Sequence, residues 1–314
     1  MTLAPSPLAS PRLGMACAAG AAMLFSSNDM LVKLLSGGYP LHQIVFVRSI
    51  VGILMMVLIV APLEGARATL KTPRWRVHAL RGLFVTLANL TFFTALAAMP
   101  LAEATAIFFV APLLITGLSV VFLGELVGPR RWAAVAVGFV GVLAVMRPGS
   151  SSFQLAALLP LLAACFYAGI HILTRKLGVA ERASTMALYI QVVFFVVAGL
   201  WGLVAGDGSF MLWDHPSLRF LFSPWVWPNA EDALTIFAVG LLSGGGAYLI
   251  TQAYRQGEAA LIAPFEYLSL MMSVVWSYAI WGYAPDLFAA LGIALILGAG
   301  LFIAWREARV AKAI

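Results

Sequence analysis

A few charged side chains interrupt the long apolar stretches of this sequence, and they are the residues best placed to do chemistry. Asp29, Arg48 and Glu266 lie deepest within such stretches, and His171 lies nearer the end of one. A charge at the centre of a membrane helix costs about 2.5–3.5 kcal/mol on insertion scales, so each of these charges needs a structural or functional reason. Carboxylates, a guanidinium and an imidazole can hold a charged solute, pair with one another or carry a proton.

Glu266 is the first candidate for a solute-binding carboxylate. It stands two residues after Pro264, and a proline inside a helix removes one backbone donor and frees an upstream carbonyl. Carriers use helices broken in this way to expose polar groups at the middle of the membrane. Tyr267 continues the same polar stripe. The alternative is a buried ion pair between Glu266 and Arg48 that fixes the helix bundle.

Each of the other charged candidates could have a structural role instead of a functional one. Asn28 and Asp29 are about 100° apart on a helix and can face one cavity, although Asp29 could instead cap a kinked helix. Arg48 lies about 10 Å inside its span at 1.5 Å per residue. It could hold a solute carboxylate, but a structural salt bridge is the favoured interpretation. His171 is either hydrogen-bonded to a neighbour or a proton carrier.

Uncharged polar and aromatic side chains complete the candidate lining. Three consecutive glycines, Gly244 to Gly246, indicate close helix packing or local unwinding in one of the same stretches. The remaining candidate binding residues are Asn89, Phe108, Tyr167, Tyr248, Gln252, Tyr267 and Trp276.

The composition says which elements must position these residues. Hydrophobic residues make up 62% of the 314, charged residues 10%, and the mean hydropathy is +0.98. Soluble chains carry about 25% charged residues, so a water-facing surface is excluded and a membrane protein is indicated. The basic residues fall in short connections rather than in a continuous patch, which argues against nucleic acid. Cys17 and Cys165 both lie in apolar runs, so a disulfide framework is not expected.

An apolar run of about 20 residues is long enough to cross the hydrocarbon core as a helix. Most connections between such runs are short, and the long segment 206–232 is acidic and aromatic, as a piece on the membrane surface or a substrate lid would be. The ten expected spans are 13–35, 41–61, 77–97, 102–123, 130–147, 153–174, 184–205, 233–255, 259–281 and 286–305.

The basic residues predict the orientation of these spans. With the N-terminus in the cytoplasm, fifteen Lys and Arg residues fall on the cytoplasmic side, whereas only Lys33, Arg147 and Arg219 fall outside. Cytoplasmic connections carry the excess of positive charge in membrane proteins. We therefore expect both termini to be cytoplasmic.

Short similarities indicate an internal repeat. The residues 103–107 that open the fourth span resemble 258–262, which open the ninth, and 119–121 recurs as 273–275. The chain thus divides into halves of five spans, 1–150 and 151–314. An odd number of spans inverts the second half relative to the first, and inverted repeats can expose a site at the middle of the membrane to either side in turn. The alternative is a duplication relic in a scaffold or enzyme.

Several motifs carry a resemblance that covers nearly the whole chain. They are Phe46-Val47-Arg48, Ala111-Pro112, Phe122-Leu123-Gly124-Glu125, Arg131-Trp132, Gly138, Gly141, Arg147-Pro148-Gly149, and Pro285-Asp286 with Gly292 and Gly300. With ten spans in an inverted repeat, they resemble the EamA-type branch of the drug/metabolite transporter superfamily. The resemblance implies solute transport through a central cavity that the third and eighth spans line. Tyr283 departs from the family, which often has Glu there, and this favours a structural or gating role for Glu125.

The fold class we predict is therefore an all-α integral membrane protein with ten transmembrane helices around a central cavity. It would be an inner-membrane secondary carrier that works by alternating access, with no catalytic residue, cofactor or metal. Carboxylates beside aromatic faces suit a cationic or zwitterionic metabolite, such as an amino acid, an amine or an adenosylated sulfonium compound. Protons or a counter-substrate are the candidate coupling partners, and monomer and homodimer both stay open. The alternative is a membrane-embedded enzyme or assembly factor that acts on lipid.

Overall fold

The computed structural model describes residues 11–64, 72, 74–124, 127–149, 154–177, 183–212, 214–256 and 259–311, and the elements in these ranges are helices. A π-helical turn, Met56–Val60, joins α2 to α3, and a 3₁₀ turn, Leu155–Ala157, precedes α9. The helices are α1 Pro11–Leu35, α2 Leu41–Met55, α3 Ala61–Glu64, α5 Trp75–Leu96, α6 Leu101–Phe108, α7 Ala111–Leu123, α8 Pro129–Met146, α9 Leu158–Leu177, α10 Ala183–Ala205, α11 Pro216–Phe222, α12 Ala230–Gln256, α13 Ala259–Glu266, α14 Leu268–Trp281 and α15 Leu287–Ala311.

Within the described ranges, nine segments are long and apolar enough to cross a membrane, and they coincide with nine of the ten expected spans. The remaining expected span, 259–281, is divided at Tyr267 into α13 and α14. Leu101–Leu123 also contains a break, at Phe109 and Val110 between α6 and α7. Each break lies within three residues of a proline, Pro112 or Pro264, because proline cannot donate a backbone hydrogen bond and its ring crowds the preceding turn.

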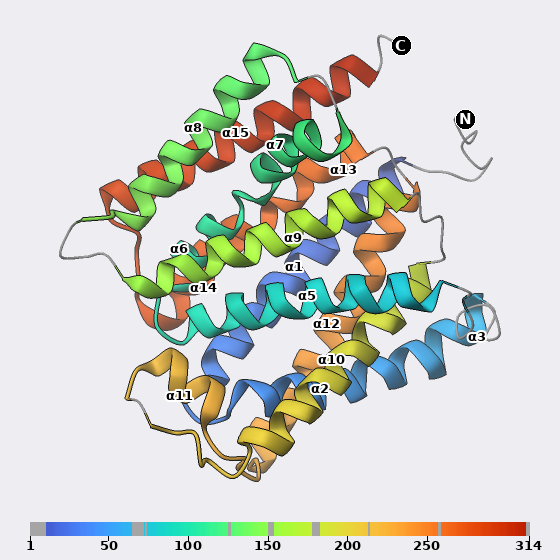
Figure 1. Ribbon diagram of the computed structural model, residues 1–314, viewed down its shortest axis with the longest axis vertical. Helices are drawn as coiled ribbons and strands as arrows, with labels where there is room; N and C mark the ends of the chain where they lie inside the picture. Colours follow the sequence, from blue (N-terminus) through green and yellow to red (C-terminus); the bar gives the residue numbers. More distant parts are fainter. Residues whose placement is uncertain are drawn as a thin grey trace.

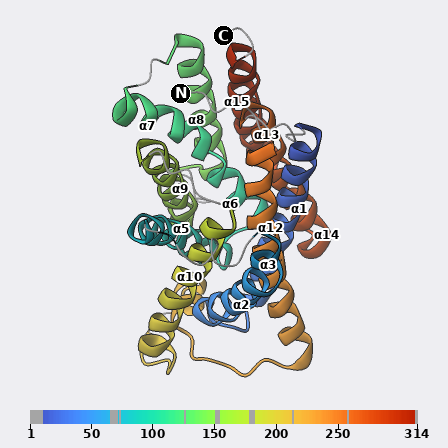
Figure 2. The same ribbon diagram turned by 90° about the vertical axis from the view of Figure 1, so that its right-hand side faces the viewer.

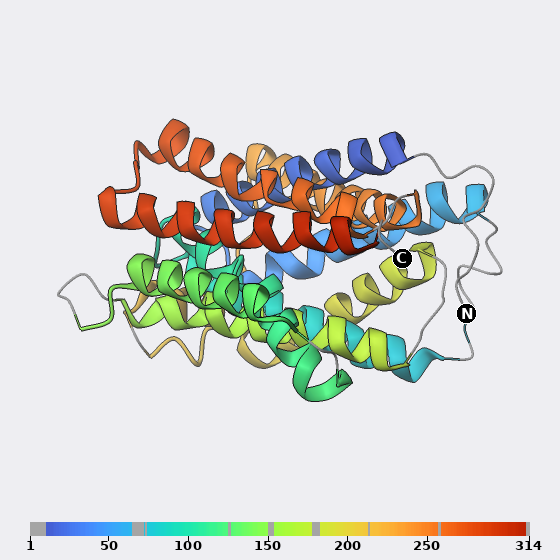
Figure 3. The same cartoon turned by 90° about the horizontal axis from the view of Figure 1, so that it is seen from above.

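The long helices run roughly along one direction, and α1 begins at the same end of the bundle where α15 ends (Figure 1). We call the opposite end the distal end; it holds the connections 36–40, 97–100, 206–229 and 282–286. Seen from above, the blue, orange and red ribbons of α1 and α13–α15 form one side of the bundle, and the cyan and green ribbons of α5, α8 and α9 form the other (Figure 3).

Helix contacts join these two sides in a regular way. On one side α1 packs against α12, α13 and α14, and on the other α9 packs against α5, α6 and α7. Between the sides, α2 contacts α10 and α12, α10 contacts α5, and α8 lies along α15. Gly141 and Gly292 bring α8 and α15 together, since a Cβ on either glycine would lie within 2.8 Å of the other's carbonyl oxygen.

Large apolar side chains cover the outside of the bundle, such as Leu203 (86% exposed), Val121 and Leu234. Exposed apolar surface on this scale is unfavourable in water and is what a lipid-facing helix presents. The buried core instead runs along the helix interfaces. The burial pattern therefore agrees with a protein that spans a membrane.

The segment 206–232 was expected to lie on the membrane surface or to act as a lid. Its residues 206–212 and 214–229, which precede α12, are docked at the distal end, at the bottom of Figure 2. The side-chain amide of Gln43, at the start of α2, makes two hydrogen bonds with the backbone of Val226. Its Nε2 donates to the Val226 carbonyl oxygen at 2.6 Å, and its Oε1 accepts the Val226 N–H at 3.1 Å. Phe220 of α11 is buried, and the ring of Trp225 packs on Phe46 at 5.6 Å between centroids. These contacts fix the segment to the helices.

Candidate functional site

Glu266 lies at the last residue of α13, next to the break at Tyr267, where the sequence placed it. The hydroxyl of Tyr254, on α12, donates a hydrogen bond to its Oε1. Its carboxylate is also close enough to Tyr167 and Tyr267 to act on both electrostatically. The expected alternative, a pair between Glu266 and Arg48, is wrong, because the hydrogen-bonding partners are Tyr254 and Asn89 respectively.

Aromatic rings from α6, α9 and the two helix breaks gather near Glu266. Tyr167 on α9 contacts Phe108 edge to face at 5.4 Å and His171 at 4.7 Å between ring centroids. Phe109, in the break between α6 and α7, meets Tyr267, in the break between α13 and α14, at 5.0 Å. The two helix breaks therefore touch through their aromatic residues. We call Phe108, Tyr167, His171, Glu266 and Tyr267 the Glu266 cluster.

Arg48 stands in a second group. Its side chain is only 1% exposed, and Nη2 donates to the Asn89 amide oxygen at 3.0 Å. Its guanidinium lies over the rings of Phe93 and Phe194, 5.1 and 4.7 Å from their centroids. Flanking aromatic faces stabilise a desolvated cation through their ring quadrupoles. Arg48 is thus held by an amide and two rings, rather than by the salt bridge that the sequence favoured.

Asp29 connects α1 to this second group. Asn28 Nδ2 donates to Asp29 Oδ1 at 3.0 Å, and Asp29 and Arg48 attract each other electrostatically. The two groups are joined by neighbouring rings that are tilted against each other, with 5.8 Å between the centroids of Phe93 and Phe92 and 5.3 Å between those of Phe92 and Phe108. The candidate residues on α1, α2, α5, α6, α9 and α13 therefore form one continuous polar and aromatic network.

Three candidate residues present buried polar atoms that no described residue pairs. They are the Asn28 amide oxygen, the Tyr267 hydroxyl and the Trp276 indole N–H. A buried polar atom left unpaired costs about 1–3 kcal/mol, so such atoms normally bind water or a ligand. The hydroxyl of Tyr267 also lies against Gly300, where an added Cβ would come within 1.7 Å of it.

Three candidates lie apart from the network. Gln252 Nε2 donates to the Tyr248 hydroxyl at 3.0 Å along one face of α12, and Tyr248 packs against the apolar cluster of Met56 and Leu188. Trp276 is half-buried and packs against the main core. The carboxylates Glu125 and Glu258 lie outside the described residues.

The structure adds residues that the sequence did not single out. Tyr254 of α12 reaches Glu266 of α13 because the two helices contact each other, and no periodic signal in the sequence reports that pairing. Phe93 and Phe194 belong to ordinary apolar runs. One further contact did have a sequence signal, because Tyr283 stands where the family often has Glu. The structure shows that the Tyr283 hydroxyl donates a hydrogen bond to the carboxylate of Glu103.

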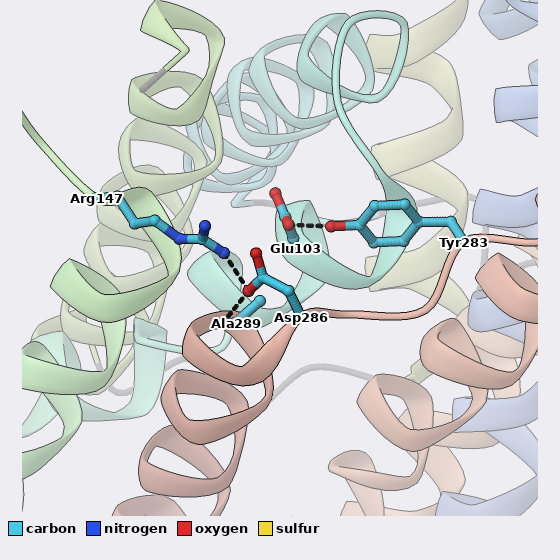
Figure 4. A network of polar contacts seen from close by, with 5 residues as sticks. All are labelled: Glu103, Arg147, Tyr283, Asp286 and Ala289. Atoms are coloured by element: carbon cyan, nitrogen blue, oxygen red, sulfur yellow. Dashed lines mark hydrogen bonds and ion pairs between the residues drawn. The ribbon is translucent and has the colours of Figure 1, made fainter. Parts of the chain in front are cut away.

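The contact between Tyr283 and Glu103 belongs to a polar network at the distal end (Figure 4). Arg147, in the left-handed conformation after α8, binds Asp286 Oδ1, and the same oxygen accepts the N–H of Ala289 at 3.0 Å and so caps α15. The Arg147 guanidinium holds the pKa of Asp286 below its usual value. Burial, together with the Glu103 carboxylate, raises the pKa of the Tyr283 hydroxyl. We call these residues the distal network.

Comparisons with known proteins agree with this architecture. A model of the EamA-like transporter family matches residues 12–147. A riboflavin transporter of Rhizobium johnstonii is 33% identical over 75% of this chain and 72% of its own. An S-adenosylmethionine uptake transporter of Rickettsia bellii is 29% identical over 90% of each chain. A pseudopaline exporter of Pseudomonas aeruginosa is 27% identical over 90% of this chain and 93% of its own.

A solved crystal structure has the same fold, with a TM-score of 0.63 at 23% identity over 96% of this chain and 100% of its own. The relatives named above are transporters, so the alternative of a membrane enzyme that acts on lipid is not supported. The chain belongs to the EamA-like transporter family, in the drug/metabolite transporter superfamily, and is a multi-pass membrane transporter of small metabolites rather than an enzyme.

Proposed function

We propose that this chain is a secondary carrier that moves a cationic or zwitterionic organic metabolite across the inner membrane by alternating access. The observation that carries the proposal is the Glu266 cluster, a carboxylate beside tyrosine rings at a broken helix in an apolar bundle. A carboxylate pairs with a positive charge, and aromatic faces attract cations and stack on flat rings. Asp29 supplies a second carboxylate from α1, joined to the first by the ring network.

Alternating access needs two related halves, and the helix contacts support such a relation between 1–150 and 151–314. The contacts of α1 with α12, α13 and α14 recur, five spans along, as those of α9 with α5, α6 and α7. Likewise α2 with α12 corresponds to α10 with α5. The two broken spans end alike, on Gly124 (φ 67°) and Gly282 (φ 63°) in the left-handed conformation. An inverted repeat accounts for these correspondences.

The contacts at the distal end support a state that is closed there. The Ser277 hydroxyl of α14 accepts the buried N–H of Ala102 of α6 at 3.0 Å, and Tyr283 binds Glu103 beside it. Both contacts join the first half to the second. Opening the distal end would separate α6 from α14 and break both, whereas the tightly packed pair of α8 and α15 could stay together.

The names of the relatives suggest which solutes should be tested first. Riboflavin and S-adenosylmethionine, named for two of them, both carry flat heteroaromatic rings, and the sulfonium of the second is positively charged. A flat ring suits the aromatic side chains of Phe108 and Tyr167, and a cation suits Glu266.

Uptake into sealed vesicles tests the proposal. The purified full-length protein is reconstituted, and accumulation of radiolabelled S-adenosylmethionine, riboflavin and a panel of amino acids and amines is measured with and without a proton gradient. We expect one cationic or zwitterionic solute to accumulate chemically unchanged. Glu266→Gln should lower its kcat/KM by about tenfold or more, since a hydrogen-bonded charge contact is lost.

Glu231→Gln is the matched control, because Glu231 is an exposed carboxylate in the first turn of α12, far along the chain from the cluster. Its uptake should equal that of the wild type. Undiminished uptake by a folded Glu266→Gln protein would contradict the charge-pairing role, and a modified product inside the vesicles would contradict transport.

A further inference from the structure

A cavity of about 320 Å³ opens at the distal end, outside the candidate site. Residues 97–101 of the first half form one wall, and Ser277, Trp281 and Tyr283 of the second half form the other, with Lys33 between them. Its volume is at the lower end of the range for small-molecule sites, about 300–1,000 Å³.

Lys33 is fixed in this cavity by the end of α5. Its Nζ donates to the carbonyl oxygens of Leu96 at 2.6 Å and Met99 at 2.8 Å, which lack helical partners at a helix C-terminus. An ammonium has three donors, so one remains for which the described residues provide no acceptor. The cation is also placed over the ring of Trp281, 5.5 Å from its centroid.

The charge of the cavity favours an anion. Among the described residues that line it, the Lys33 ammonium is the charged group and there is no carboxylate. Glu103 lies one contact further away, and its carboxylate already accepts the Tyr283 hydroxyl. The Trp281 side chain is 37% exposed and offers a flat apolar face next to the cation. A fixed cation beside an accessible indole suits a carboxylate attached to a flat ring.

We propose that this cavity binds the carboxylate end of a flat organic solute, with the carboxylate on Lys33 and the ring against Trp281. The inference rests on the proposed carrier function and deepens it: it adds a carboxylate-binding site at the distal end to the cation-binding carboxylate Glu266, which lies about 20 Å away along α14 at 1.5 Å per residue. Because the two walls come from opposite halves and are joined by the Tyr283–Glu103 and Ser277–Ala102 contacts, separation of the halves would open the site.

Equilibrium binding to the full-length protein in lipid nanodiscs tests this site. The probes are indole-3-acetate, the uncharged indole-3-ethanol and the amine tryptamine, measured by titration calorimetry. We expect indole-3-acetate to bind about tenfold or more tightly than the alcohol, because a charge-assisted hydrogen bond is gained. Lys33→Gln should abolish this preference, and Lys33→Arg should keep it. Trp281→Leu should weaken binding of indole-3-acetate by about two- to tenfold, as loss of an aromatic contact does.

Arg219→Gln is the matched control, since it removes an exposed cation of α11 at the same end and should leave binding unchanged. Equal affinities for the three probes would overturn the proposal, as would a folded Lys33→Gln protein that keeps the preference. If Lys33→Gln fails to fold for want of its carbonyl contacts, unchanged binding by Trp281→Leu overturns the proposal instead. Probe binding without any vesicle uptake would contradict the proposed carrier function but not this site. Vesicle uptake without probe binding would contradict this site but not the carrier function.

Discussion

Arg48 is the largest fully buried side chain among the described residues. Its guanidinium donates a hydrogen bond to an amide rather than to a carboxylate. The rings of Phe93 and Phe194 cover its faces, so water does not compensate the charge. Asn89 therefore matters more as the partner of Arg48 than as a direct contact for a solute. The sequence indicated a polar role for Asn89, because an amide in an apolar run needs a partner, but it did not indicate that this partner is Arg48.

The first prediction concerns this partner. Asn89→Leu removes the acceptor of a buried, charged donor and should lower the free energy of unfolding by roughly 1.5–3 kcal/mol. Thermal unfolding in detergent measures the loss. Asn89→Asp, which keeps an acceptor oxygen, should retain the wild-type stability, and the KM of the folded Asn89→Leu protein should not change. A raised KM with unchanged stability would instead place Asn89 on the solute.

The second prediction concerns Asp286, whose pKa Arg147 holds below the ordinary value. A carboxyl with a lowered folded-state pKa stabilises the protein above its unfolded pKa, about 3.9, and loses this contribution as the pH falls through the folded pKa. Asp286→Asn should therefore lower the Tm at pH 7, and the difference in Tm from the wild type should shrink as the pH falls below about 4. A difference that is independent of pH would show that the carboxylate charge is not what stabilises the distal network.

At the scale of helices, the contact between α8 and α15 depends on glycines whose backbones nearly touch. A Cβ on Gly292 would lie 2.6 Å from the Gly141 carbonyl oxygen and 2.6 Å from Val145 Cγ2, whereas a Cβ on Gly298 of the same helix would meet nothing within 4 Å. Backbone atoms cannot move aside as the end of a flexible side chain can. Gly292 and Gly298 should therefore respond in opposite directions to the same substitution.

The third prediction uses this difference. Gly292→Ala should destabilise the protein by roughly 1–3 kcal/mol, the usual cost of overpacking. Gly298→Ala should stabilise it by roughly 0.5–1 kcal/mol, because alanine loses less backbone entropy in a helix. Thermal unfolding of both variants in one detergent decides the matter. Equal effects would mean that α8 and α15 do not pack as closely as the structure describes.

Helix positions were largely predictable from the sequence, because an apolar run of membrane length reports a span directly. The break beside Pro264 was also indicated, since proline has a fixed effect on the helix that contains it. The residues that pair across different helices could not be predicted from the sequence. Tyr254 meets Glu266, and Tyr283 meets Glu103, through the packing of separate elements, and single-sequence patterns contain no signal for such pairs.

For the whole molecule, the membrane class and the transporter family followed from composition and motifs, and the comparisons confirm both. The orientation of the termini stays a prediction. The inverted relation of the two halves also stays a prediction, and the recurring helix contacts support a repeat. The cavity beside Lys33 could not be foreseen, because its walls come from segments about 180 residues apart. The packing of α6 against α14 brings these segments together.

The most direct test of alternating access is a reversible cross-link across the distal end. Glu103→Cys and Tyr283→Cys, in a background without Cys17 and Cys165, are joined by a short bifunctional thiol reagent that a reductant cleaves. Uptake into vesicles should fall by about tenfold or more when the linker holds the halves together and should recover on reduction, since a locked equilibrium cannot cycle.

The matched control places the same linker across Arg147→Cys and Asp286→Cys, at the end of the closely packed pair of α8 and α15, and should leave uptake largely intact. Full uptake by the protein linked between positions 103 and 283, with the linkage verified by mass spectrometry, would contradict a carrier whose halves separate at this end.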